Sequence, residues 1–195
     1  AMRRLMQLTV EGYKSIASQT LDLGRLNVLI GGNGVGKSNL ISVFKMLRDI
    51  YDGNLQAAVG KAGGANALLH FGRKKTSLIR LQVVFSAEGS SYRNAYRVYL
   101  SPTDQDLLVF TKESAAFQVT SKHARPYWQE FGSGHVEAKL SKQSGEIGKI
   151  VEIVQRDLAS YRVYPFCDTS DSAAVKQTGD VGDNRFLRAN ADNLA

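Results

Sequence analysis

The fold of this chain is decided by one stretch, Leu26-Asn27-Val28-Leu29-Ile30-Gly31-Gly32-Asn33-Gly34-Val35-Gly36-Lys37-Ser38. Residues 31–38 match G-x-x-x-x-G-K-[ST], the pattern of a phosphate-binding loop, which requires a buried strand before it and a helix after it. The apolar residues Val28, Leu29 and Ile30 predict that strand. The helix is predicted by apolar residues at helical spacing, namely Leu40, Ile41, Val43, Phe44, Met46 and Leu47. A glycine-rich turn that binds nothing is the alternative, and the complete context argues against it.

The residue types of the loop suit the binding of a nucleotide. Its glycines allow positive φ angles and close backbone approach, so that successive N–H groups can surround a phosphate at the start of a helix. We expect Lys37 to reach the β- and γ-phosphates, and the hydroxyl of Ser38 to ligate Mg²⁺. Asn33 and Asn39 would tune the loop. The predicted nucleotide-binding residues are therefore Gly31, Gly32, Asn33, Gly34, Val35, Gly36, Lys37, Ser38 and Asn39, with Ser38 as the metal ligand.

Composition places the chain among globular proteins. Its 195 residues, 43% of them hydrophobic, can build the core of one large domain or of part of a bigger protein. A single cysteine, Cys167, excludes an intramolecular disulfide and fits a reducing cytosol, where its simplest role is that of a small buried residue. No apolar run approaches the roughly 20 residues of a membrane span. These features predict a cytoplasmic protein without membrane contact, and Ala1 ahead of Met2 is interpreted as a tag remnant.

The net charge of +7 is unevenly distributed. Residues 71–100 contain only Glu88 as an acidic residue, against the basic residues Arg73, Lys74, Lys75, Arg80, Arg93 and Arg97. With Tyr92, Tyr96 and Tyr99 interleaved as stacking groups, this stretch could face nucleic acid. The favoured interpretation is a solvated sheet edge that is protected by charge.

Hydrophobic patterns predict the remaining elements. Alternation indicates strands at 6–10 and 20–23, and an antiparallel meander of strands at 78–85, 92–100, 107–112 and 117–120, the last two separated by Glu113-Ser114. The helix after the loop should end near Asp52-Gly53, and residues 60–72 read as loop with one helical turn. Residues 125–134 read as irregular, and an amphipathic helix at 147–158 precedes a strand at 161–164. His70, Trp128 and His135 are interpreted as packing residues.

Beyond these patterns, the chain resembles the head domains of ABC-type ATPases, closest to the SMC, RecF and OLD-like branch and to bacterial AAA family ATPases of the ABC-like type. The segments that carry this resemblance are 12–16, 23–40, 166–170, 183–188 and 193–195. The resemblance implies an α/β P-loop NTPase fold with an antiparallel β-subdomain, and ATP with Mg²⁺ as ligands. It also implies that Lys14 lies near the nucleotide. The strand at 161–164 resembles the one leading to the Q-loop, which implies a position for Asp168 near the metal and the attacking water, although no glutamine stands clearly there.

One departure from the family pattern concerns catalysis. The family hydrolyses ATP with an apolar strand ending in Asp-Glu, a signature helix from a second head and a switch histidine, and the best apolar runs here end in Ser86 and Thr111 instead. We therefore expect residues 2–195 to be the N-terminal part of one head, with the loop strand and helix at 26–52, the β region at about 77–120 and the Q-loop-like region at about 146–170. In complete form, two such heads would hydrolyse ATP as a homodimer.

Two other functions are compatible with a phosphate-binding loop. The first is an ATP-sensing module with little turnover that binds DNA or an effector, with Arg73, Lys74, Lys75 and Arg80 as the candidate DNA contacts. The second is a small GTPase or kinase. It is disfavoured because the chain lacks an Asn-Lys-x-Asp guanine-reading motif, and because an antiparallel insertion after the loop helix suits neither class.

Overall fold

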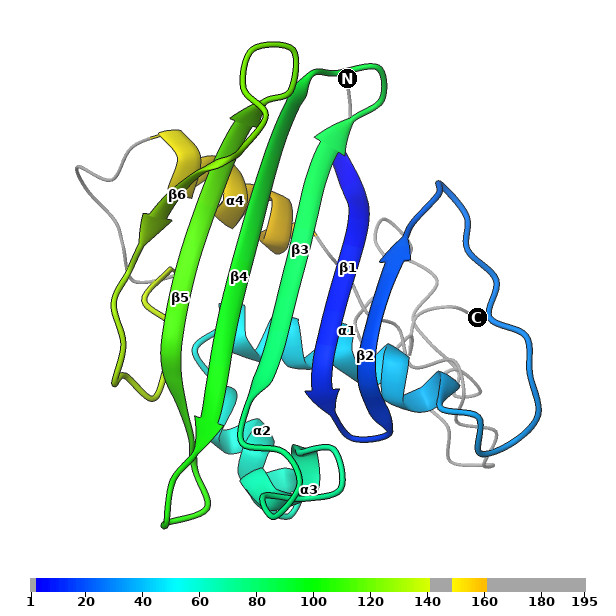
Figure 1. Cartoon of the computed structure of the whole chain (residues 1–195), viewed down its shortest axis with the longest axis vertical. Helices are drawn as coiled ribbons and strands as arrows, with labels where there is room; N and C mark the ends of the chain where they lie inside the picture. The colour runs from blue at the N-terminus through cyan, green and yellow to red at the C-terminus, as the bar shows by residue number, and fades with distance from the viewer. Residues whose placement is uncertain (1–2, 141–148, 161–195) are drawn as a thin grey trace, which may run out of the picture. The chain divides into compact units, whose positions relative to one another are not determined.

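The computed structural model describes residues 3–140 and 149–160. All described elements belong to one compact unit, Ala1–Ala159. That unit contains a six-stranded antiparallel sheet in the order β2-β1-β3-β4-β5-β6 (Figure 1). The strands are β1 Arg3–Tyr13, β2 Ile16–Asp22, β3 Ile79–Ala87, β4 Tyr92–Pro102, β5 Leu108–Val119 and β6 Tyr127–Glu130. The helices are α1 Lys37–Tyr51, α2 Leu55–Lys61, α3 Ala65–Leu68 and α4 Lys149–Ala159.

Alternating side chains give the sheet one apolar face. In β3 the buried residues Ile79, Leu81, Val83 and Phe85 alternate with more exposed ones, as expected for a strand buried on one side only. The register with β4 sets Leu81 opposite Val98 and Val83 opposite Tyr96, so that the apolar positions of neighbouring strands meet on the same face. The strands predicted at 6–10, 20–23, 78–85 and 92–100 are confirmed, as is the antiparallel meander.

Helices cover this apolar face. In Figure 1, α1 and α4 lie behind the sheet, whereas α2 and α3 lie at one end of it. Helix α4 packs against β4 and β5 with Val151, Val154 and Leu158 buried, and an ion pair between Arg3 Nε and Asp157 Oδ2 at 2.8 Å ties it to β1. The predicted helix at 147–158 is thus confirmed from residue 149 on.

The continuity of β5 overturns the predicted break at Glu113-Ser114. Glu113 is fully buried, and its carboxylate accepts hydrogen bonds from the Tyr96 hydroxyl and from the backbone N–H groups of Lys139 and Leu140. The His135 ring contributes a fourth contact, with Nε2 at 2.7 Å from Oε2. Because these partners satisfy the buried carboxylate, a charged residue fits within the strand. His135 therefore packs inside the unit, as expected, stacked on Phe110.

One further expectation is wrong. The region 125–134, predicted to be irregular, contains β6, which pairs with β5 through Ala116 and Trp128 among others. The region 60–72, predicted to be loop with one helical turn, contains the single turn of α3 between loop segments, but residues 60 and 61 end α2, a helix that the sequence did not predict. Glu137 explains why α2 can form, because its carboxylate accepts the free N–H groups of Leu55 and Gln56 at 2.8 and 2.9 Å. The strand predicted at 161–164 lies outside the described residues.

Candidate phosphate-binding loop

The apolar run before the loop is not the buried strand that the sequence predicts. Residues 26–30 form no strand, and Leu26, Val28 and Ile30 are 83%, 70% and 91% exposed. The reason is the sheet order: β2 is an edge strand, and no described strand pairs with residues 26–30. In Figure 1 the segment that joins β2 to α1 extends beyond the β2 edge of the sheet.

The loop itself has the backbone that its glycines predict. Gly34 and Gly36 have φ angles of 84° and 97°, in the left-handed region that favours glycine. Gly36 is the N-cap of α1, and its carbonyl accepts the first helical hydrogen bond from Leu40 N at 3.0 Å. No side chain caps this helix and no acidic residue lies in its first turn. The helix thus offers its N–H groups and the positive end of its dipole to an anion.

Lys37 folds back onto the loop. Its Nζ donates to the carbonyl oxygens of Gly31 and Gly32 at 2.5 and 2.6 Å, which fixes the start of the loop against the start of α1. Its neighbour Ser38 is exposed on the first turn of the helix, and Asn33 and Val35 are exposed in the loop. A Cβ at Gly31 would come within 2.9 Å of Val35 Cγ2, so a larger residue here would have to displace the Val35 side chain.

The turn between β1 and β2 packs against the first two turns of α1. Asn39 Nδ2 donates to Ser15 Oγ at 2.8 Å, so Asn39 holds this turn in addition to following the loop. Lys14, with a left-handed φ of 48°, directs its Nζ to Ser42 Oγ at 3.2 Å. Its carbonyl oxygen lies 2.7 Å from His70 Nδ1, which gives His70 the packing role that the sequence predicted. Lys14 therefore contacts α1 about one turn beyond Ser38.

Sequence reasoning missed the polar face of α1 that meets this turn. Ser42, Lys45 and Asp49 follow one another at spacings of three and four residues, interleaved with the buried Val43, Met46 and Ile50. Side chains at these spacings share one helix face. The signal was present in the sequence, but it does not reveal that the end of β1 supplies Tyr13, and the turn after it Lys14, to the same place.

The basic stretch at 71–100 is not a sheet edge, which corrects the favoured interpretation. Arg80 and Arg97 lie on the central strands β3 and β4, and each is paired with a carboxylate, Arg80 with Glu11 at 2.9 Å and Arg97 with Glu130 at 3.5 Å. Tyr96 cannot stack on a nucleic acid, because it is buried against Glu113.

The other residues singled out from the sequence lie either in the loop before β3 or outside the described residues. Arg73 contacts Asp106 Oδ1 at 3.3 Å and the Thr103 carbonyl at 2.6 Å, whereas Lys74 and Lys75 are exposed beside it. Asp168 and Cys167 lie outside the described residues. Within residues 3–140 and 149–160, no group of three His, Cys, Asp or Glu side chains could hold a metal ion, and no helix is long and apolar enough to cross a membrane.

A glycine loop that carries an inward-folded lysine and leads into an uncapped helix defines the class of P-loop nucleotide-binding domains. Residues 26–134 match the family described as "AAA domain, putative AbiEii toxin, Type IV TA system". Because the match covers more than half of the chain, this protein belongs to that family. The P-loop NTPase fold class and the AAA ATPase family that the sequence predicted are thereby confirmed, and with them nucleotide binding in general.

Solved structures include a similar chain, from work described as "Structural biochemistry of ATP-driven dimerization and DNA stimulated activation of SMC ATPases". The two chains are 16% identical, with a TM-score of 0.37, over 80% of this chain and 99% of that chain. A comparison with curated proteins finds no match to this sequence.

Proposed function

We propose that residues 31–38 bind ATP together with Mg²⁺. The observation that carries this proposal is the junction of loop and helix, where two left-handed glycines lead into a helix whose first N–H groups have no side-chain cap. Such N–H groups are hydrogen-bond donors that a phosphate satisfies well, because the helix dipole adds to their attraction. The family membership of the chain supports the same conclusion.

The side chains of the loop fit the two parts of this ligand. The Lys37 ammonium donates to two carbonyl oxygens of the loop, and phosphate oxygens would compete for it as stronger, charged acceptors. Ser38 supplies an exposed hydroxyl oxygen, the hard type of ligand that Mg²⁺ prefers. Bound Mg²⁺ would neutralise phosphate charge during phosphoryl transfer.

We further propose that hydrolysis takes place between two heads, each of which contributes groups to the other's nucleotide. This proposal rests on the family resemblance, since the apolar runs of this chain end in Ser86 and Thr111 and not in the Asp-Glu pair. A DNA-binding function is the weaker alternative, because Arg73 and Arg80 are already paired with carboxylates. It would rest on the exposed pair Lys74 and Lys75.

The first test concerns Lys37. We expect Lys37→Ala to weaken Mg-ATP binding by roughly 10- to 100-fold, because each hydrogen bond to a charged phosphate is worth about 1.5–3 kcal/mol. Calorimetric titration of the 195-residue chain with Mg-ATP measures this effect. Lys122→Ala is the matched control, since Lys122 is exposed and far along the chain from the loop. Equal affinities of Lys37→Ala and Lys122→Ala would contradict the proposal.

The second test concerns the metal. If Ser38 ligates Mg²⁺, removing the metal with EDTA should lower the ATP affinity of the wild type clearly and that of Ser38→Ala only slightly. The same titration, run with Mg²⁺ and with EDTA for both proteins, gives the four affinities required. A wild type whose affinity does not respond to EDTA would argue against a metal ligand at this position.

A further inference from the structure

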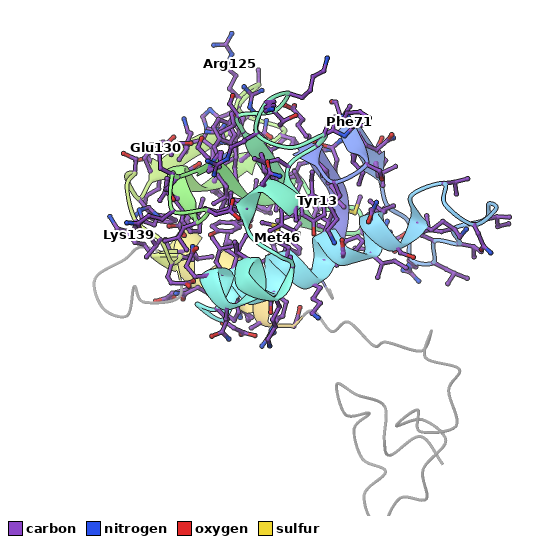
Figure 2. The ribbon with its side chains drawn as sticks, turned by 90° about the horizontal axis from the view of Figure 1, so that it is seen from below. Tyr13, Met46, Phe71, Arg125, Glu130 and Lys139 are labelled. Atoms are coloured by element: carbon purple, nitrogen blue, oxygen red, sulfur yellow. The ribbon has the colours of Figure 1, made fainter. Side chains whose placement is uncertain are left out.

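A cavity of about 490 Å³ lies beside the middle and the end of α1, outside the loop. Its walls come from the end of β1 and the turn after it, from α1, from α2 and from the end of α3. Met46, Leu55, Val59 and Leu68 give it an apolar floor. Figure 2 labels Tyr13 and Met46, which line it from the strand side and from the helix side.

The polar lining of this cavity is strongly cationic. Three ammonium groups, those of Lys14, Lys45 and Lys61, face a single carboxylate, that of Asp49. Lys14 Nζ donates to Ser42 Oγ, but no described residue hydrogen-bonds the ammonium of Lys45 or Lys61 or forms an ion pair with it. The lining side chains thus carry three positive charges and one negative charge, a formal balance of +2.

The charged groups are close enough to affect one another. Burial lowers the pKa of Lys14, and the nearby positive charge of Lys45 lowers this pKa further. Burial raises the pKa of the Asp49 carboxyl, while Lys45 and Lys61 act in the opposite direction. Cations held together in a partly buried site destabilise one another unless an anion lies between them.

The cavity is separate from the loop. Helices rise about 1.5 Å per residue, so Lys45 lies roughly 12 Å and Asp49 roughly 18 Å along α1 from Lys37. Phosphates bound at the helix N-terminus would therefore not neutralise these side chains.

We propose that this cavity binds a small phosphate-bearing molecule. A phosphate dianion matches the +2 balance of the lining, and ammonium groups are strong donors to its oxygens. The apolar floor and the volume leave room for a neutral body attached to the phosphate, and the Asp49 carboxylate can accept a hydrogen bond from a hydroxyl group of that body. The source of the phosphate is either a hydroxylated organic phosphate or free inorganic phosphate.

The test uses the 195-residue chain with Lys37→Ala, which removes the main phosphate contact of the loop. We expect calorimetry to show that this protein still binds inorganic phosphate and ribose 5-phosphate. Adding Lys45→Met and Lys61→Met should weaken both by about tenfold or more. The control pair Lys74→Met and Lys75→Met makes the same change of charge on exposed lysines outside the cavity, and it should leave both affinities unchanged.

The two probes distinguish the source. Tighter binding of ribose 5-phosphate identifies an organic phosphate as the ligand, and equal binding identifies free phosphate; both results support the site. The proposal is overturned if the Lys37→Ala protein binds neither probe, or if the control pair weakens binding as much as the cavity pair. When Lys45→Met and Lys61→Met are introduced together into the wild-type chain, calorimetry should show an unchanged affinity for Mg-ATP. The experiments therefore distinguish the two sites: Lys37→Ala tests ATP binding at the loop, and the two cavity substitutions test phosphate binding in the cavity.

Discussion

Gly64 occupies a position in the described unit that only glycine fits without strain. Its φ angle is 98° and a Cβ built on it would lie 1.7 Å from Asp106 Oδ2. Asp106 cannot easily move away, because its backbone carbonyl accepts from Ala65 N and its side chain accepts from Asn66 N. Glycine at 64 therefore lets the loop before β5 hold the start of α3.

Substitution of this glycine should destabilise the fold. We expect Gly64→Ala to lower the free energy of unfolding by roughly 1–3 kcal/mol, because alanine there is strained and collides with a fixed carboxylate. Gly60→Ala is the matched control: nothing lies within 4 Å of its Cβ position, and alanine inside α2 should stabilise by about 0.5–1 kcal/mol. Urea unfolding measures both, and effects of the same sign and size would refute this account of Gly64.

At the scale of elements, the alternation of apolar and polar residues predicts strands well. A polar residue within a strand, in contrast, led to a predicted break that the structure does not have. Strands β3 and β4 follow their apolar pattern closely, because each buries one face. The break assigned at Glu113 was wrong for a physical reason: its four hydrogen-bond partners include residues 135, 139 and 140, which lie far along the chain. A local pattern cannot show that a buried charge has partners from distant segments.

The run at 26–30 shows the opposite error. Its apolar character is real, but burial of a strand depends on a neighbouring strand, and no local pattern supplies one. We expect Ile30→Ser to change the free energy of unfolding by no more than about 0.5 kcal/mol, whereas Ile79→Ser, the same substitution at a fully buried position, should cost about 2–5 kcal/mol. Urea unfolding compares the two. A similar cost at both positions would restore the buried strand that the sequence predicted.

At the scale of the whole described unit, the sheet and its helices form a framework from which the loop projects. The loop residues could be predicted from sequence because eight consecutive residues carry the motif. The cationic cavity could not, because Lys14, Lys45 and Lys61 come from a turn and two helices that only the fold brings together. The expected places of Lys14 near the nucleotide and of Asp168 near the metal stay predictions.

The central claim is that residues 31–38 hold the phosphates of the nucleotide. The most direct measurement is an amide NMR spectrum of the ¹⁵N-labelled chain during titration with Mg-ATP. We predict that the backbone N–H signals of residues 32–38 shift the most and reach saturation, because these groups would donate to the phosphates. In Lys37→Ala the same signals should require roughly 10- to 100-fold more Mg-ATP to reach saturation. Shifts confined to other parts of the chain, or loop signals that saturate at the same Mg-ATP concentration in Lys37→Ala, would contradict the claim.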